Sequence, residues 1–195
     1  MLKVLIINGA EQRKMAPGKF NESMIETTQN SLTSYTEVRV THAASHYDIK
    51  EEQEKIIWAD IIIFQFPVYW FNVPSSLKKF FDNVYEYGLF FGPSEHYGEG
   101  GYLTDKFYML STTWNAPIDA FSHTHGLFSK KHPDDLLLAI HTTQQYIGMQ
   151  PLPSFSAFNI VKQPNFSHWQ KQWQAHLTQY INSSLLNTRI QNNSL

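Results

Sequence analysis

The run Asp60-Ile-Ile-Ile-Phe-Gln-Phe66 is the feature that most restricts the fold, because it is almost wholly apolar and rich in β-branched residues. A short continuous run of this kind is typical of a strand that is buried on both faces of a parallel sheet. The run is too short to cross a bilayer, and Pro67 ends it. Lys3–Ile7 has the same character. We therefore predict that both runs are central strands of a sheet whose two faces are covered.

Along the rest of the chain, strand patterns alternate with helix patterns. Further strands are predicted over Glu37–Thr41, Phe107–Ser111 and Phe155–Val161. Helices are predicted over Phe20–Tyr35, Tyr47–Ala59 with Asp48 as its N-cap, Ser75–Tyr87, Pro133–Gly148 and Phe166–Leu186. This alternation predicts a doubly wound α/β sandwich, a parallel sheet with helices on both faces. The length fits one domain over residues 1–187 and a polar tail over 188–195.

Composition argues against several classes of function. The formal net charge is −2 over 195 residues, with no basic stripe of the kind that binds nucleic acid. The chain has no cysteine, so it has no disulfide, thiolate nucleophile or cysteine metal site, which fits a reducing cytosol. The apolar run near the N-terminus is too short for a signal peptide. We expect a soluble, cytoplasmic protein that neither inserts into a membrane nor binds nucleic acid.

In a doubly wound sheet, ligands bind outside the carboxyl ends of the strands, so the loops that follow the strands are the places to search. The first of these loops, Asn8–Phe20, leads into a predicted helix N-terminus and carries Arg13, Lys14 and Lys19. Such a loop can bind phosphate through backbone N–H groups. It contains neither a dinucleotide-binding glycine motif nor a P-loop. A solvated basic loop is an equally good interpretation.

The second loop, Pro67–Pro74, contains three consecutive aromatic residues, Tyr69, Trp70 and Phe71. Three neighbours at the end of a strand cannot all point into the core, so a flat ring stacked against them would explain the pattern. A hydrophobic dimer patch is the alternative, and the two are compatible.

The third loop, Ser111–Pro117, offers polar groups at Thr112, Thr113 and Asn115 that could read the heteroatom edge of a ring. Trp114 is expected to offer a second aromatic face. Asn115 could equally be a structural turn residue.

Histidines are frequent, and His123, His125 and His132 lie close together in the sequence. No zinc-binding spacing is present, so we expect no metal site. His125 is a candidate for proton delivery near neutral pH, although a surface histidine is at least as good an interpretation. A serine hydrolase would need a Gly-x-Ser-x-Gly elbow, and the chain has none.

Taken together, these motifs resemble the NAD(P)H quinone oxidoreductase family. Three stretches carry the resemblance: Leu5–Ala10, Trp58–Pro67 with the aromatics after it, and Ser111–Pro117. Three more support it in the family's order: Pro74–Asp82, Tyr97–Gly101 and Gly148–Pro153. The resemblance implies a flavodoxin-like fold with a five-stranded parallel sheet in the order 2-1-3-4-5. It also implies FAD as cofactor, NADPH as donor, and two-electron reduction of quinones by a ping-pong mechanism in a homodimer with the active site near the subunit interface.

The resemblance also assigns site residues by position. The phosphate and ribityl segment would be Ala16, Pro17, Gly18, Lys19, Phe20, Asn21 and Ser23. The ring would lie against Pro67, Tyr69, Trp70, Phe71 and Asn72 on one side and Thr113, Trp114, Asn115, Ala116 and Pro117 on the other. Tyr97 would come from the loop before Gly100 and act in catalysis with His125.

Two departures from the family pattern leave alternatives open. The family's His-Ser pair in the first loop is Met15 and Ala16 here, so a hydroxyl contact to phosphate is missing and FMN could replace FAD. The segment Gly88–Tyr97 is also shorter than in relatives, which could alter substrate access or dimer contacts. The alternative functions are an FMN-dependent azo or nitro reductase, a flavodoxin-type electron carrier, for which the small net charge is weak support, and a flavin-free binding module.

Overall fold

The computed structural model describes residues 1–14, 18–32 and 36–181. Its centre is a parallel sheet of six strands in the order β2-β1-β3-β4-β5, with β6 also paired to β4. The strands are β1 (Leu2–Asn8), β2 (Thr36–His42), β3 (Ile61–Pro67), β4 (Phe107–Thr113), β5 (Gln150–Pro151) and β6 (Phe155–Ala157). The predicted strand order is confirmed.

The fifth position of the sheet differs from the prediction, because two short strands share it. The predicted strand Phe155–Val161 ends at Ala157, and β5 precedes it. Pro151 and Pro153 lack the N–H that a continuous ladder needs, which explains the interruption. Asn159 then takes a left-handed φ of 57°, so the extended backbone cannot continue to Val161.

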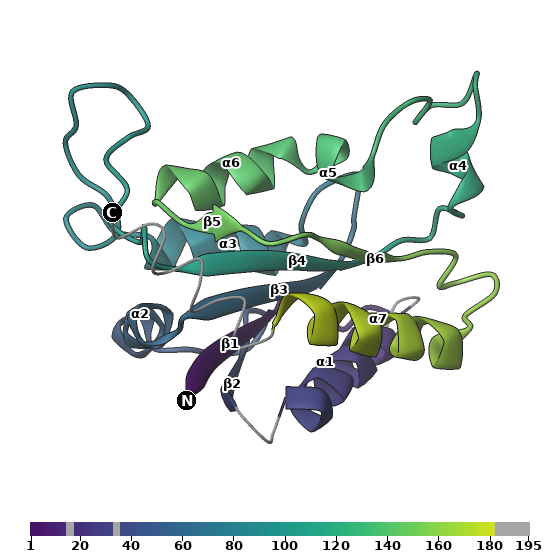
Figure 1. Cartoon of the computed structure of the whole chain (residues 1–195), viewed down its shortest axis with the longest axis horizontal. Helices are drawn as coiled ribbons and strands as arrows, with labels where there is room; N and C mark the ends of the chain where they lie inside the picture. Colours follow the sequence, from purple (N-terminus) through teal and green to yellow (C-terminus); the bar gives the residue numbers. More distant parts are fainter. Residues whose placement is uncertain (15–17, 33–35, 182–195) are drawn as a thin grey trace.

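Two helical layers cover the sheet, as predicted. The helices are α1 (Lys19–Leu32), α2 (Ile49–Trp58), α3 (Ser75–Val84), α4 (Asp119–Ser122), α5 (Pro133–Leu136), α6 (Leu138–Tyr146) and α7 (Phe166–Tyr180). In Figure 1, α1 and α7 lie together on one side of the sheet, and α3 and α6 lie on the other. The buried face of α2 packs in the same hydrophobic cluster as α3 and α6.

Alternation along the central strands produces these two layers. Ile61 and Ile63 of β3 pack in the cluster that contains Trp173 of α7, whereas Ile62 and Phe64 pack in the cluster on the α3 side. All four are fully buried. The continuous apolar run is therefore two interleaved faces, each with the period of two that a strand imposes.

The helix boundaries agree with the sequence signals in one case and depart from them in another. Asp48 caps α2 as predicted, since its Oδ1 accepts a hydrogen bond from the Glu51 N–H at 3.1 Å. The predicted helix Pro133–Gly148 is instead two helices, α5 and α6, because Leu137 between them has φ −104° and ψ 17°. Gly148 follows with φ 100°, which suits glycine after a helix end.

Other helix ends shift by a few residues. The structure ends α3 at Val84, three residues before the predicted Tyr87. The predicted extension of α7 to Leu186 and the polar tail lie outside the described residues, as does the predicted end of α1 at Tyr35. None of the helices among the described residues is long and apolar enough to span a bilayer.

A partly buried chain of polar contacts ties the α5–α6 segment to β4. The Tyr108 hydroxyl, on a fully buried side chain, lies 2.8 Å from His141 Nδ1. On the other side of the ring, His141 Nε2 lies 3.2 Å from Asp134 Oδ1. Burial raises the pKa of the Asp134 carboxyl, but the contacts with His141, Ser154 and His132 together outweigh this effect, and the net pKa is lowered.

We predict that Asp134 makes folding stability depend on acid. A carboxyl whose pKa is lower in the folded state stabilises the protein fully above its unfolded pKa of about 3.9 and loses that contribution as the pH falls through the folded pKa. Asp134→Asn should therefore lose less stability than the unmodified chain between pH 5 and pH 3. Urea unfolding midpoints at both pH values measure this.

The exposed Asp119 provides the control. Asp119→Asn should follow the unmodified chain at both pH values. An Asp134→Asn protein that loses as much stability on acidification as the unmodified chain would show that the carboxyl is not stabilised by its contacts.

Candidate functional site

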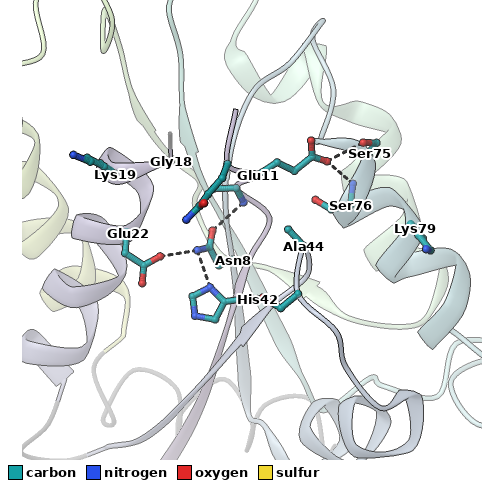
Figure 2. A pocket seen from close by; sticks show the side chains of 13 residues that line it. Asn8, Glu11, Gly18, Lys19, Glu22, His42, Ala44, Ser75, Ser76 and Lys79 are labelled. Carbon is teal, nitrogen blue, oxygen red and sulfur yellow. Dashed lines mark hydrogen bonds between the residues drawn. The ribbon is translucent and has the colours of Figure 1, made fainter. Parts of the chain in front are cut away.

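A cavity of about 1100 Å³ opens at the carboxyl ends of β1 and β2, between the N-termini of α1 and α3 (Figure 2). Its walls come from the loop after β1, the first turn of α1, the loop after β2 and the start of α3. The residues that line it are Asn8, Ala10, Glu11, Gln12, Gly18, Lys19, Glu22, His42, Ala44, Ser45, Ser75, Ser76 and Lys79. The helices that follow the adjacent strands β1 and β3 are α1 and α3, and they lie on opposite faces of the sheet. The cavity between their N-termini is therefore at the switch point where such sheets bind ligands.

The N-terminus of α1 forms one wall of the cavity. Gly18 precedes the helix with φ 79°, and its carbonyl accepts the Glu22 N–H at 3.0 Å. The first N–H groups of a helix have no partner within it and attract anions, and Lys19 adds positive charge. Of the predicted phosphate segment, Gly18 and Lys19 thus line the cavity. Ala16 and Pro17 lie outside the described residues.

A polar cluster at the end of β1 was not anticipated from the sequence. Asn8 is buried, and its Oδ1 accepts the Ala10 N–H at 2.9 Å. Its Nδ2 donates to Glu22 Oε2 at 3.0 Å and lies 3.2 Å from His42 Nδ1 (Figure 2). The amide therefore fixes a carboxylate and an imidazole on the cavity wall. The available signal was a polar residue placed directly after a buried strand.

Glu11 lies on the opposite wall and caps α3. Its Oε1 accepts hydrogen bonds from the Ser76 N–H at 2.7 Å and the Ser75 hydroxyl at 2.8 Å. Its Oε2 accepts two from Arg13, at 2.7 and 3.1 Å. The N-cap position of α3 is Pro74, which has no side-chain cap, so Glu11 takes that role from a distant part of the chain. Burial opposes ionisation, but these hydrogen bonds outweigh it and lower the pKa of Glu11 to about 2.

The loop after β3 folds into a tight turn between Tyr69 and Asn72, whose backbone N–H and carbonyl groups exchange two hydrogen bonds of 3.0 Å. The two central residues, Trp70 and Phe71, have φ values of 51° and 62°. Such a turn normally takes Asn and Gly, and a bulky residue in this region costs about 1–3 kcal/mol. Trp70 is nonetheless 93% exposed and Phe71 45% exposed. Phe71 also packs edge-on against the buried Phe128, but Trp70 is strained and almost fully exposed without a core role, which indicates a binding function. We call residues Tyr69–Asn72 the aromatic turn.

Beneath these loops, Asn21, Gln65 and Thr113 meet in a buried cluster. Gln65 Nε2 donates to Asn21 Oδ1 at 2.8 Å, and Asn21 Nδ2 donates to the Thr113 hydroxyl at 3.2 Å. All three are at most 2% exposed. Gln65 Oε1 is buried with no partner among the described residues. The predicted residues Asn21 and Thr113 are thus brought together at the junction of β3, β4 and α1, although both side chains are already engaged.

The structure corrects the expectation that Trp114 offers an open aromatic face. The side chain is 3% exposed, packs against Phe121 and Phe158, and donates its indole N–H to the Thr112 hydroxyl at 2.8 Å. An aromatic ring at a strand end can fold back into the core as easily as outward, and sequence order does not distinguish the two. The neighbouring Asn115 and Pro117 are exposed, and Ala116 is half-buried.

Three further residues assigned to the cofactor, Phe20, Ser23 and Pro67, are packed or partly buried in the fold. Phe20 packs edge-on against Phe166 at 5.2 Å, and Ser23 is half-buried along α1. Pro67 is buried at the end of β3, where it pairs with Thr113. These positions support the walls of the site.

Tyr97 lies at the other edge of the sheet from the cavity of its own chain. This residue lies in the connection between the end of α3 and the start of β4, and therefore at the amino ends of the strands, opposite the aromatic turn (Figure 1). Its ring is 95% exposed and lies 5.7 Å from that of Tyr146. Within one chain, Tyr97 cannot reach the cavity or the aromatic turn.

His125 lies in the connection that follows β4, at the same edge of the sheet as the aromatic turn. It is exposed in the segment between α4 and α5. Phe128 of the same segment contacts Phe71 of the aromatic turn, with ring centroids 5.4 Å apart. Among the described residues, no group of three His, Asp or Glu side chains could hold a metal ion.

These features fit a ligand that has both a phosphate and a flat ring. The α1 N-terminus with Gly18 and Lys19 suits the phosphate, and the aromatic turn suits the ring. The α1 N-terminus and the aromatic turn follow the adjacent strands β1 and β3. Gln65, whose buried Oε1 has no partner among the described residues, lies near the end of β3 and pairs with β1 and β4.

Comparison with known proteins agrees with this geometry. Residues 2–180 match a family described by its flavodoxin-like fold. The chain is 33% identical to the NADPH:quinone oxidoreductase MdaB of Haemophilus influenzae over 187 residues, which cover 90% of this chain and 97% of that protein. A crystal structure assigned to the quinone reductases, from Klebsiella pneumoniae, has a TM-score of 0.76 at 25% identity and covers 91% of this chain and 84% of its own. General stress protein 14 of Treponema denticola in complex with FMN has a TM-score of 0.66 at 19% identity, with 96% and 99% coverage, so that likeness shows the fold alone. The chain therefore belongs to the flavodoxin-like fold family that includes the NADPH:quinone oxidoreductase MdaB.

Proposed function

We propose that this protein is a flavin-dependent NAD(P)H:quinone oxidoreductase. The observation that carries the proposal is the aromatic turn, which holds Trp70 and Phe71 in strained, exposed positions at the same edge of the sheet as the cavity at the α1 N-terminus. The relationship to MdaB supports the same reaction class. The bound flavin would supply the chemistry, accepting hydride from a reduced nicotinamide and passing it to a quinone.

We further propose FAD, with the phosphates at Gly18 and Lys19. The cavity does not stop at α1 but continues to His42, Ala44 and Ser45 after β2. A mononucleotide would end at the α1 N-terminus, whereas the adenylate half of FAD needs the additional room. Backbone groups at the helix start and the charge of Lys19 would compensate for the missing hydroxyl at Ala16.

The residues of the aromatic turn would position the ring. The N–H groups of Tyr69 and Asn72 are bonded across the turn, so the N–H groups of Trp70 and Phe71 are the ones that can face a ring edge. Backbone donors aimed at a ring stabilise negative charge that develops on it. Asn115, Ala116 and Pro117 would border the ring's other side, and His125 would deliver a proton.

A second copy of the chain would complete the site. Tyr87, Tyr97 and Tyr102 form an exposed aromatic group in the connection before β4, and Trp70 forms another at the opposite edge. In a two-fold dimer the tyrosines of each subunit can cover Trp70 of the other subunit. Tyr97 would then act on the partner's ring. A cytoplasmic location is part of the same proposal, supported by the absence of cysteine.

We predict that Trp70→Gly separates binding from stability. Glycine adopts a positive φ without strain, so the free energy of unfolding should stay the same or rise by about 1 kcal/mol. Loss of the indole should raise the flavin dissociation constant roughly tenfold or more. Urea unfolding and flavin fluorescence titration measure the two quantities.

Lys130→Gly is the matched control, because Lys130 also has a left-handed φ, 59°, but lies outside the aromatic turn. It should gain stability without a change in flavin affinity. Unchanged flavin affinity in Trp70→Gly would contradict the proposed position of the ring.

We predict that mixed dimers restore activity. Trp70→Gly and Tyr97→Ala should each give a protein with little quinone turnover. In a mixed dimer, one of the two sites combines an intact Trp70 with an intact Tyr97 from the partner. Random mixing should therefore recover about one quarter of the unmodified activity. If Trp70 and Tyr97 of the same chain act in one site, mixing restores no activity, and that result would refute a site shared between subunits.

A further inference from the structure

Two loops flank the proposed cofactor site, and side chains of the first hold the second in place. The loop after β1 carries Glu11 and Arg13, and the segment after β3 carries the aromatic turn followed by the start of α3. Glu11 accepts hydrogen bonds from Ser75 and Ser76 at 2.8 and 2.7 Å, which joins the loop to α3 (Figure 2).

Arg13 extends the connection to the aromatic turn. Its Nη2 and Nε donate to Glu11 Oε2 at 2.7 and 3.1 Å. Its guanidinium carbon also lies 4.4 Å from the ring centroid of Tyr69, within cation–π range. Because Tyr69 closes the aromatic turn through its bonds with Asn72, one carboxylate fixes both α3 and the turn.

The connection persists across the physiological pH range. With its pKa lowered to about 2, Glu11 is ionised whenever the protein is folded near neutrality. The Glu11 side chain is 17% exposed and that of Arg13 is 49% exposed, so the pair is only partly screened by solvent. Glu11 also accepts hydrogen bonds from the first turn of α3, where Pro74 provides no side-chain cap.

We infer that Glu11 and Arg13 are positioning residues that hold the loop after β1 and the aromatic turn in the geometry that the cofactor requires. This inference rests on the proposed function. A phosphate group and a ring bind to two different loops, so a fixed distance between the loops removes an ordering cost from binding. Glu11 lines the cavity, but its carboxylate is already bonded to the start of α3 and to Arg13. In this proposal the two residues therefore act through α3 and through Tyr69.

The chain contains a matched control for the test. Glu37 and Arg39 on β2 form the same pair two residues apart, at 3.0 Å, with the Arg39 guanidinium 3.9 Å from the Trp58 ring. This pair lies outside the residues that line the cavity. It therefore reproduces the ion pair and the aromatic contact without the connection between loops.

The experiment compares Glu11→Gln and Arg13→Met with Glu37→Gln and Arg39→Met. Protein freed of flavin is mixed with FAD, and association and dissociation rates are followed by flavin fluorescence. Urea unfolding and the visible circular dichroism of the bound flavin are recorded on the same samples. We expect the dissociation rate to rise roughly tenfold in both site variants and the circular dichroism to change, with the control pair unaffected in both.

The outcomes separate the two proposals. Arg13→Met keeps the cap on α3, so it gives a folded protein even if Glu11→Gln destabilises the helix. If the unmodified chain binds flavin and the site variants behave like the control pair, the positioning role is wrong and the proposed function stands. If the unmodified chain binds no flavin under any condition, the proposed function is overturned and the inference with it.

Discussion

Burial of β1 and β3 on both faces determines where every other part of this molecule lies. Their alternating side chains divide between two clusters, one with α1 and α7 and one with α2, α3 and α6. With both faces covered, the polar ends of the strands are the only part of the central sheet that remains open to a ligand. Asn8 and Gln65, the polar residues at those ends, consequently become part of the candidate site instead of part of the core.

The charge distribution in the cavity follows from the same arrangement. Helix N-termini from α1 and α3 both point toward it, which favours anions. Glu11 neutralises the α3 terminus and Arg13 neutralises Glu11, whereas Glu22 is held by the Asn8 amide. The α1 terminus with Lys19 is thereby left as the proposed position for a phosphate. This division of the two termini connects the fold to the choice of ligand.

Much of the fold could be predicted from the sequence, because the relevant signals are local. The two helical layers and the Asp48 cap depend on periodicity and on single capping residues, whereas the strand order was implied by the resemblance to the quinone oxidoreductases. The break at Leu137 was missed because apolar spacing continues through it. The strand β5 was missed because two residues, one of them proline, are too few to show a strand period. For the site, Lys19 was predicted from the loop that precedes a helix and Gly18 from the resemblance, and both line the cavity. The burial of Trp114 and the position of Tyr97 were not, since they depend on side-chain direction and on which edge of the sheet a connection occupies.

The most direct test of the central claim is the flavin content of the purified protein, measured by absorbance in the flavin bands and by the mass of the released cofactor. The account predicts stoichiometric FAD, because the cavity continues from the α1 terminus to the loop after β2. Stoichiometric FMN would retain a flavin enzyme but contradict the use of that extension. Protein that lacks flavin and takes up none from excess FAD would contradict the proposed function itself.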